Sequence, residues 1–443
     1  MMKISSYLLP FILFFHYPAF SQDKEFASKV ENYIRPYVSS QNFSGSILIS
    51  RKGKIVFSKA YGYANQELKV PTEPTTVFHL ASISKTFTAA AVLMLEQKGL
   101  LTTGDTLSKY IPDFPSASQM TIHHLLAHTS GITDINDLPE YDLASLQQQT
   151  PASLVALLKT KPLEFQPGEK YSYTSSNYAL LALIIEQVSG MTYGDYLKEN
   201  IFKPLKMNQT WHHANMIDII PNMAEGYDTD KNFGLQKAAY MDWSSKAGGG
   251  SLVSTTLDLA KWNAALFGIS ILSEKSKKKM FTEYVESGYG WYIGKQFDKD
   301  YILMNGRAPG VCTHMGRYPE DETFIIVLSN INVYTPRQIA TDLAGILFNK
   351  PVDTPNLDHN LSDGESRELV GKYQFGEDFY RSNYLLEVTS QNGKLLSNYG
   401  ELVPNKPYQF FQRSYWLRVS FNKNAAGNVD SVTIGGFRAE RAE

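Results

Sequence analysis

A serine and a lysine three residues apart stand at the start of an alanine-rich stretch and could perform acyl-transfer chemistry together. Ser82 and Lys85 open the apolar run that continues through residues 86–95, a pattern that predicts a buried helix. Residues i and i+3 share one face of a helix, so the Lys85 amine can act as the base that a serine nucleophile requires. The N-terminus of such a helix also adds positive potential where an oxyanion would form.

This spacing is a common pattern, and alone it leaves both a catalytic and a coincidental interpretation open. The same pattern occurs at Ser21/Lys24, Ser276/Lys279 and Ser420/Lys423. Only the pair at Ser82 opens a long apolar helix that could be buried beneath a site.

Four segments, in order along the chain, resemble the motifs of one known family. Residues 77–88 (VFHLASISKTFT) resemble the nucleophile motif of the serine β-lactamase-like family, which includes class C β-lactamases, DD-peptidases and related esterases. Its other motifs are matched by residues 121–132 (TIHHLLAHTSGI), 167–173 (PGEKYSY) and 247–260 (AGGGSLVSTTLDLA). The resemblance spans roughly residues 25–348 and implies an α/β (α+β) fold of the β-lactamase/DD-peptidase type, an antiparallel sheet flanked by a helical subdomain.

The resemblance also implies the catalytic roles. Ser82 becomes the acylated nucleophile, and Lys85 and Tyr173 share the general-base and general-acid work. Free lysine and tyrosine have pKa values near 10, and mutual proximity in a partly desolvated cleft can shift both. The chain has 27 tyrosines, and Tyr173 stands out by its position after the Pro-Gly pair of its motif. No cofactor and no metal is implied.

The second motif of the family departs from the usual Tyr-x-Asn, whose amide holds the acyl part of the substrate. Ser175 stands at the amide position here and has a shorter side chain. Asn177, two residues further on, is the candidate to replace that amide.

The third motif of the family is a lysine or histidine followed by x-Gly, and here Met304 stands at its first position. A methionine cannot bind the carboxylate of a β-lactam or of a terminal D-alanine, so we expect esters to be better substrates than β-lactams. Gly306 is retained, and the backbone N–H of Arg307 is the expected second oxyanion donor beside that of Ser82. Arg307 is also the candidate cation for an anionic substrate.

Other residues that could do chemistry are interpreted as structural. His124 and His128 have the i, i+4 spacing of a metal pair on a helix, but no third ligand stands nearby. Cys312 is interpreted as a small buried residue, with a reactive thiol as the alternative. It is the only cysteine of the chain, so no intrachain disulfide can form.

The two ends of the chain differ from the middle. Residues 1–21 combine Lys3, the apolar run 7–15 and Ala19-Phe20-Ser21, a pattern typical of a removable secretory signal peptide. We therefore expect an exported protein, periplasmic or secreted, without stable membrane insertion after removal of the signal.

A hydrolase domain is expected over residues 22–354 and a C-terminal β-domain over residues 355–443. The polar, proline-bearing segment at 350–356 predicts the linker between them. Beyond it, short strands with Asn-Gly-type turns predict a small β-barrel or sandwich. The segment 369–373 (LVGKY) and the strands that follow resemble the lipocalin-like domain appended to some members of the family.

The balance of 42 Lys+Arg against 44 Asp+Glu gives no electrostatic reason to expect nucleic acid or an anionic membrane as a partner. The expected partner is a small-molecule or peptide-like substrate. Two functions remain open: an exported serine hydrolase that acts on esters or peptide-like amides through an acyl-enzyme, or a catalytically impaired protein that keeps the fold and binds a cell-wall peptide or another ligand.

Overall fold

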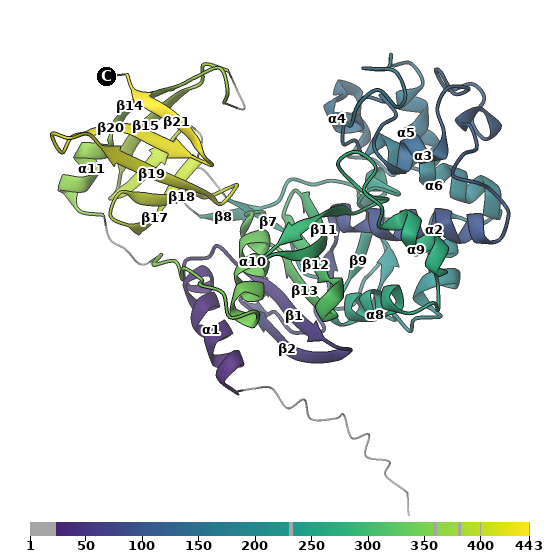
Figure 1. The fold of residues 1–443 in the computed structure, drawn as a ribbon, viewed down its shortest axis with the longest axis horizontal. Coiled ribbons are helices and arrows are strands. Elements are labelled where there is room, and N and C mark those ends of the chain that lie inside the picture. The colour runs from purple at the N-terminus through teal and green to yellow at the C-terminus, as the bar shows by residue number, and fades with distance from the viewer. Residues whose placement is uncertain (1–23, 230–233, 358–360, 380–381, 399, 443) are drawn as a thin grey trace, which may run out of the picture.

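The computed structural model describes residues 24–229, 234–357, 361–379, 382–398 and 400–442 (Figure 1). The signal peptide expected at residues 1–21 lies outside them. The described chain forms a body built on a six-stranded sheet with flanking helices, followed by a closed β-barrel. The predicted fold class, an α/β (α+β) body with an antiparallel sheet and flanking helices followed by a small C-terminal β-barrel, is confirmed.

The central sheet is antiparallel and has the strand order β10-β11-β12-β13-β1-β2. Its strands are β1 (Gly45–Arg51), β2 (Lys54–Tyr61), β10 (Tyr292–Gln296), β11 (Lys299–Ala308), β12 (Val311–Tyr318) and β13 (Thr323–Ser329). β1, the first strand of the chain, pairs with β13, the strand of this sheet that comes last in the sequence. Gly45 lies opposite Ser329, and Arg51 lies opposite Thr323. Both β12 and β13 are buried along their whole length, which fits the β-branched and apolar run in β13.

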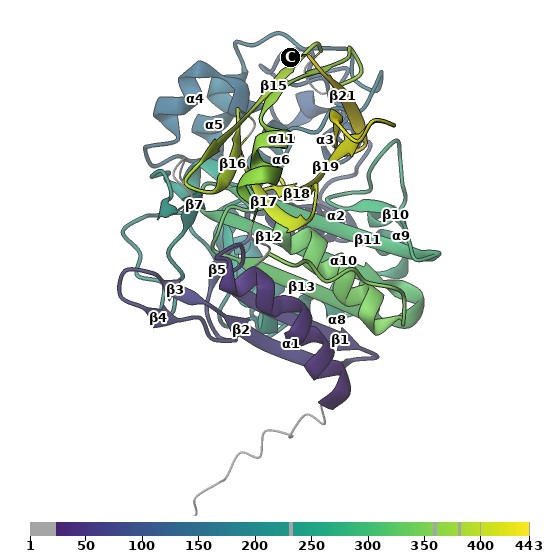
Figure 2. The same ribbon diagram turned by 90° about the vertical axis from the view of Figure 1, so that its left-hand side faces the viewer.

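Helices cover both faces of this sheet. α1 (Lys24–Ser39) and α10 (Thr335–Leu347) lie side by side over one face (Figure 2). On the other face, α2 (Ser84–Gln97) and α8 (Thr256–Phe267) share one hydrophobic core with the strands. α2 is buried from Ser84 to Leu95, as expected for a helix that is apolar on all sides.

A helical layer packs around α2 and away from the barrel (Figure 1). It contains α3 (Ile122–Leu126), α4 (Pro139–Ala144), α5 (Pro151–Leu158) and α6 (Ser176–Ser189). The predicted buried helix at 86–95 falls in α2. α6 ends at Gly190, whose φ of 69° is left-handed, and the Thr255 side chain caps α8 by accepting from the Asp258 N–H.

The C-terminal barrel consists of eight consecutive strands. They are β14 (Gly371–Phe375), β15 (Leu385–Gln391), β16 (Lys394–Ser397), β17 (Gly400–Lys406), β18 (Gln409–Gln412), β19 (Leu417–Lys423), β20 (Val429–Ile434) and β21 (Phe437–Arg441). Asn392 and Gly393 form the two-residue turn between β15 and β16, and both have a positive φ. The predicted boundary near residue 355 lies between the end of α10 and the short helix α11 (Asp363–Leu369) that precedes the barrel.

The turn between β18 and β19 joins the barrel to the body. Trp416 in this turn is 5% exposed, and its ring lies 5.4 Å from that of Tyr37 on α1. Arg413 donates a 2.9 Å hydrogen bond to the side chain of Asn42, and the Ser414 carbonyl accepts from the N–H of Tyr334. Trp416 therefore belongs to the hydrophobic core under α1 and α10.

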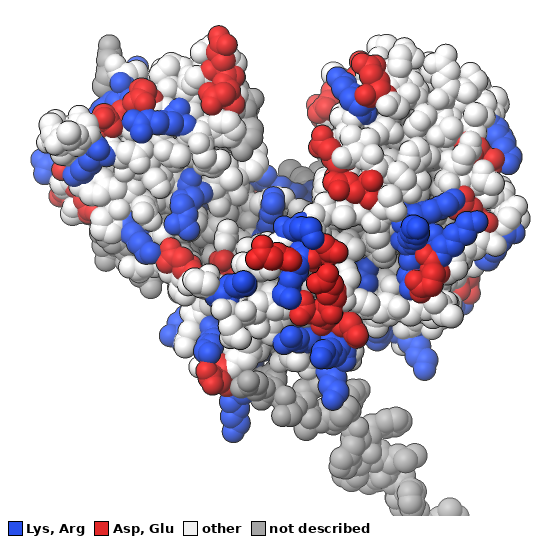
Figure 3. Space-filling view, in the orientation of Figure 1, with Lys and Arg blue, Asp and Glu red and all other residues white. Residues whose placement is uncertain are grey.

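The space-filling view shows a notch between the barrel and the helical layer, with lysine, arginine and acidic side chains along its floor (Figure 3). Both signs of charge are interspersed over this face. No helix in the described part of the chain is long and apolar enough to cross a membrane.

Candidate active site

Ser82 lies in a 3₁₀ turn, η1 (Ala81–Ile83), directly before α2 rather than within the α-helix. Ala81 has a φ of 46°, a conformation that residues other than glycine rarely adopt. The turn is held from β12, because the Thr313 hydroxyl donates a 3.0 Å hydrogen bond to the Leu80 carbonyl. Such backbone strain is typical of functional sites, and here it raises Ser82 out of the helix toward the cleft.

Lys85, on the first turn of α2, points back at Ser82. Its Nζ lies 3.2 Å from the Ser82 Oγ and donates to the Gly249 carbonyl at 2.9 Å. The side chain is fully buried. Burial lowers the pKa of Lys85 from 10.5 to about 7. The negative charge of Asp134 raises this pKa slightly, and the positive charge of Lys246 lowers it slightly. A substantial fraction of Lys85 is therefore neutral near pH 7 and able to accept the Ser82 proton.

Tyr173 lies on the other side of the nucleophile. Its hydroxyl donates a 2.8 Å hydrogen bond to the Ser82 Oγ, and its ring centroid is 5.0 Å from the Lys85 Nζ. Burial is the main reason that the pKa of Tyr173 is raised above 10. The pKa of Lys85 is therefore lowered and that of Tyr173 raised. Near neutral pH, Lys85 can accept a proton, and Tyr173 retains its own.

The two histidines with i, i+4 spacing take separate structural positions. The His128 ring lies under Tyr173 with 4.6 Å between ring centroids, and its Nδ1 accepts from the Thr174 N–H. Burial lowers the pKa of His128 to about 3, so the ring is neutral. The Nδ1 of His124 accepts from the Thr121 N–H at the start of α3. No group of three metal-ligating side chains occurs among the described residues.

Ser175 and Asn177, the two candidates for the acyl side of the substrate, lie in different places. Ser175 lines the cavity at Ser82, and its hydroxyl is 3.4 Å from the Lys85 Nζ. Asn177 is fully buried, and its Oδ1 accepts a 2.6 Å hydrogen bond from Ser130. The prediction that Asn177 replaces the missing amide is wrong, because two residues correspond to about 200° around a helix and turn Asn177 away from the cavity.

Gly306 allows β11 to lie directly against the nucleophile turn. A Cβ at this position would be 2.1 Å from the Leu80 carbonyl oxygen and 3.1 Å from the Ala81 Cβ. Only glycine therefore permits this approach. The close contact brings the backbone of β11, including Arg307, to the wall of the cavity that contains Ser82.

The side chain of Arg307 does not point where the sequence led us to expect. Its Nε donates a 2.8 Å hydrogen bond to Asn332, and its guanidinium lies 4.6 Å from the ring of Tyr415 on the barrel. Side chains alternate along a strand, so Arg307 points away from the face on which Gly306 meets the Ser82 turn. The expectation that the Arg307 side chain is the cation for an anionic substrate is therefore wrong, while the role of its backbone N–H as the second oxyanion donor stays a prediction.

Met304 occupies the motif position of the missing lysine or histidine and is buried in the same core as Ile83 and Phe87. Its side chain offers neither charge nor hydrogen bond at that point of the site. Cys312 is buried, as expected, and burial raises the pKa of its thiol to about 12.

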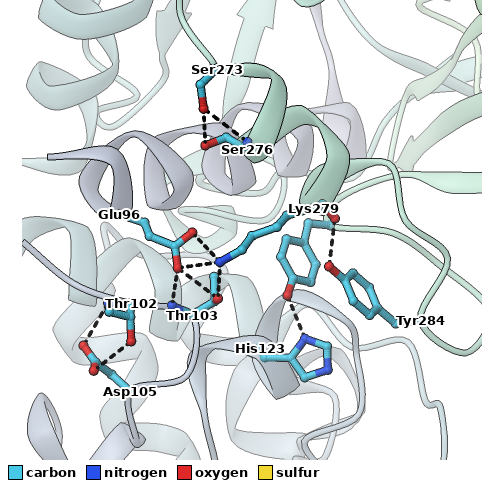
Figure 4. A network of polar contacts seen from close by, with 10 residues as sticks. Glu96, Thr102, Thr103, Asp105, His123, Ser273, Ser276, Lys279 and Tyr284 are labelled. Carbon is cyan, nitrogen blue, oxygen red and sulfur yellow. Dashed lines mark hydrogen bonds and ion pairs between the residues drawn. The ribbon is translucent and has the colours of Figure 1, made fainter. Parts of the chain in front are cut away.

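The other serine–lysine pairs serve different purposes. Figure 4 shows Lys279 turned away from Ser276 and ion-paired with Glu96, 2.9 Å from both carboxylate oxygens. The Ser276 N–H is bound by the side chain of Ser273, which caps the short helix α9 (Glu274–Met280). In the pair Ser420/Lys423, the barrel residue Lys423 forms an ion pair with Glu368 on α11. In the pair Ser21/Lys24, Ser21 lies outside the described residues.

The cavity at Ser82 has a volume of about 230 Å³. Its walls come from η1, the loop before α6, β11 and a second 3₁₀ turn, η5 (Trp243–Lys246). The lining residues are Ala81, Ser82, Asn136, Ser175, Trp243, Lys246, Gly249, Gly250, Arg307, Ala308 and Pro309. Asn136, Trp243 and Lys246 were not expected from the sequence, and the only signal for the latter two is their place just before the Ala-Gly-Gly segment.

Comparison with known proteins agrees with this geometry. A sequence profile of the beta-lactamase family matches residues 30–347. Penicillin-binding protein 4* of Bacillus subtilis (strain 168) is 30% identical over 406 residues, which cover 86% of this chain and 90% of that protein.

Solved structures share the fold. The octameric penicillin-binding protein homologue from Pyrococcus abyssi superposes with a TM-score of 0.69 and 25% identity, over 93% of this chain and 99% of that one. The D-amino acid amidase from Ochrobactrum anthropi SV3, in complex with L-phenylalanine amide, gives a TM-score of 0.65 at 24% identity, over 72% and 99%. Together with the profile match, these similarities show that the chain belongs to the beta-lactamase family of serine hydrolases.

Proposed function

We propose that this protein is an exported serine hydrolase that cleaves esters or peptide-like amides through an acyl-enzyme on Ser82. The observation that carries the proposal is the position of the Ser82 Oγ between the Lys85 Nζ at 3.2 Å and the Tyr173 hydroxyl at 2.8 Å. A buried lysine with a pKa of about 7 is a competent base at neutral pH. The basic and apolar pattern of residues 1–21 supports export.

The reaction follows from these positions. Neutral Lys85 accepts the Ser82 proton while the Oγ attacks the substrate carbonyl carbon. The backbone N–H groups of Ser82 and Arg307 stabilise the negative oxygen of the tetrahedral intermediate. As the bond to the leaving group breaks, Tyr173 donates its proton to the departing oxygen or nitrogen and regains one from protonated Lys85. Water then releases the acid from Ser82 by the reverse sequence of proton transfers.

Covalent labelling at Ser82 tests the proposal. A fluorophosphonate probe should modify the wild-type protein once, at Ser82, and the variant Ser82→Ala should not be labelled. Ser276→Ala is the matched control, since it removes the serine of another serine–lysine pair whose lysine is held by Glu96. Labelling that persists in Ser82→Ala, or that disappears in Ser276→Ala, would contradict the assignment.

The second candidate function is a binding protein with impaired turnover, and the burial of Met304 in the core favours it. The family's cation is missing at this point, and a substrate held only through its acyl part could be acylated without being released. Pre-steady-state kinetics with a p-nitrophenyl ester separate the two candidates. Continuous nitrophenolate release supports the hydrolase, whereas a single stoichiometric burst supports the binding protein.

A further inference from the structure

Lys246 belongs to the same turn that anchors the catalytic lysine. Its carbonyl accepts hydrogen bonds from the N–H groups of Gly249 and Gly250, and the Gly249 carbonyl in turn binds the Lys85 Nζ. A Cβ on Gly250 would lie 3.2 Å from the Lys246 Cβ and 3.6 Å from the backbone of Ala81. The stem of Lys246 is therefore fixed beside the nucleophile turn, and its side chain lines the cavity that contains Ser82.

The ammonium group of Lys246 is held by a neutral partner. Its Nζ donates a 2.5 Å hydrogen bond to the amide oxygen of Asn136 and lies 4.8 Å from the ring centroid of Tyr141. The Asn136 amide donates in turn to the Asp134 carboxylate at 2.8 Å. An ammonium group has three N–H donors, so this arrangement fixes the position of the charge and leaves donors for a ligand.

Lys246 is also the basic side chain best placed to meet a substrate. Arg307 shares the lining of the cavity, but its side chain lies on the face of β11 opposite to the one on which Gly306 meets the Ser82 turn, against Asn332 and Tyr415. Lys85 is fully buried behind the nucleophile and works as the base. Met304 carries no charge at the position where relatives place a cation. Among the described residues that line the cavity, Lys246 is thus the cation held beside the nucleophile turn.

The size and the wall of the cavity suit a small anionic group next to Lys246. The cavity volume of about 230 Å³ is enough for a small acyl group. Trp243, on the same 3₁₀ turn, lines the cavity, and its ring is stacked on that of His79 at 3.6 Å. A short aliphatic chain that ends in an anionic group fits an apolar wall with a cation close by.

We propose that Lys246, positioned by Asn136, binds a carboxylate of the substrate, so that the preferred substrates are small acyl compounds with a negative charge a few atoms from the scissile carbonyl. This inference rests on the proposed function of Ser82. It assigns the binding of the substrate carboxylate to Lys246, in the turn before the Ala-Gly-Gly segment. At the motif position on β11, Met304 cannot bind this carboxylate.

Matched substrate pairs test the proposal. N-succinyl- and N-acetyl-D-alanine 4-nitroanilide differ by a carboxylate on the acyl side. The thioesters of N-acetyl-D-alanine with mercaptoacetate and with mercaptoacetamide differ by a carboxylate on the leaving group. We expect Lys246→Met to lower the ratio of kcat/KM between the charged and the neutral member of one pair about tenfold, because this ratio cancels any change in the pKa of Lys85, which Lys246 also lowers. The pair that responds shows on which side of the scissile bond the carboxylate lies.

Three further variants sharpen this test. Lys246→Arg should retain most of the preference because it keeps the charge. Asn136→Asp should lower the preference, since it places a competing carboxylate against the Lys246 ammonium. Lys52→Met, which removes an exposed lysine from the β1–β2 turn, should change nothing. Equal loss on charged and neutral substrates in Lys246→Met, or no loss in either pair, would overturn the proposal.

Binding measurements separate this inference from the proposed function. Calorimetric titration of Ser82→Ala with N-succinyl-D-alaninamide needs no catalysis. We expect binding that is at least about fivefold weaker for N-acetyl-D-alaninamide and in the Ser82→Ala/Lys246→Met double variant. If Ser82 is never acylated but this difference is present, the hydrolase proposal fails and the anion site stands. If Ser82 is acylated but this difference is absent and neither substrate pair responds to Lys246→Met, the anion site fails alone.

Discussion

The proton chemistry of the site depends on the burial of one amine. Lys85 has no exposed surface, and its hydrogen-bond partners among the described residues are neutral groups, the Ser82 and Ser175 hydroxyls and the Gly249 carbonyl. Desolvation therefore disfavours its charged form and lowers its pKa to about 7. Tyr173, in the same desolvated place, is shifted upward because its charged form is the anion. The same physical cause thus prepares a base and an acid on either side of one hydroxyl.

The lowered pKa of Lys85 and the raised pKa of Tyr173 together predict the pH dependence of acylation. The active form contains neutral Lys85 and protonated Tyr173, so the rate of Ser82 labelling should rise with pH, reach half its maximum near pH 7 and stay level up to about pH 10. Lys85→Arg keeps a positive charge at every pH and should lower the rate by a factor of about 10² to 10⁴. A labelling rate that falls with rising pH between 6 and 8 would contradict the role of Lys85.

At the scale of elements, the site depends on how closely β11 approaches the turn η1. Gly306→Ala would place a Cβ 2.1 Å from the Leu80 carbonyl oxygen, so the strand or the turn must move. We expect acylation to fall at least about a hundredfold, because the oxyanion donors separate, and stability to fall by about 1–3 kcal/mol. Labelling kinetics and thermal unfolding measure the two effects.

Gly294→Ala in the neighbouring strand β10 is the matched control for Gly306→Ala. A Cβ on Gly294 meets no other atom within 4 Å, so both labelling and stability should stay close to those of the wild type. Full activity in Gly306→Ala would mean that the approach of β11 to the nucleophile turn is not needed for catalysis.

The sequence predicts the elements of this site better than it predicts the directions of its side chains. Motif order grouped Ser82, Lys85 and Tyr173, and the structure places the Lys85 Nζ and the Tyr173 hydroxyl within hydrogen-bond distance of the Ser82 Oγ. The side chain of Arg307 was misplaced because its direction depends on the register of β11 against β12. Asn177 was misplaced because its direction depends on where α6 begins. Lys246 was missed because its relation to Ser82 arises only when separate segments pack together.

At the scale of the whole molecule, the barrel is part of one packed structure with the hydrolase body. Trp416 from the barrel lies in the core beneath α1 and α10, and Tyr415 beside it contacts Arg307, whose backbone borders the active site. A sequence boundary near residue 355 predicts two domains but says nothing of this contact, because the two contacting segments are far apart in the chain.

The docked barrel predicts cooperative unfolding. Trp416→Ala leaves a large void in the core under α1 and should cost about 3–5 kcal/mol. In calorimetry, we expect a single transition in the wild type and two separated transitions in Trp416→Ala. Arg438→Ala, at an exposed residue of β21, should keep the single transition. A single unshifted transition in Trp416→Ala would show that the two units do not stabilise each other through this contact.

The pairing of β1 with β13 has a consequence for how the chain reaches its native state. Residues 45–51 cannot complete their hydrogen bonds until residues 323–329 are available, so almost the whole hydrolase body must be synthesised before its central sheet closes. Closing such a long loop is entropically costly and makes folding slow, and until then the first hairpin has an unpaired apolar edge. We therefore expect nascent chains of this protein to need protection from aggregation until residues 323–329 are available.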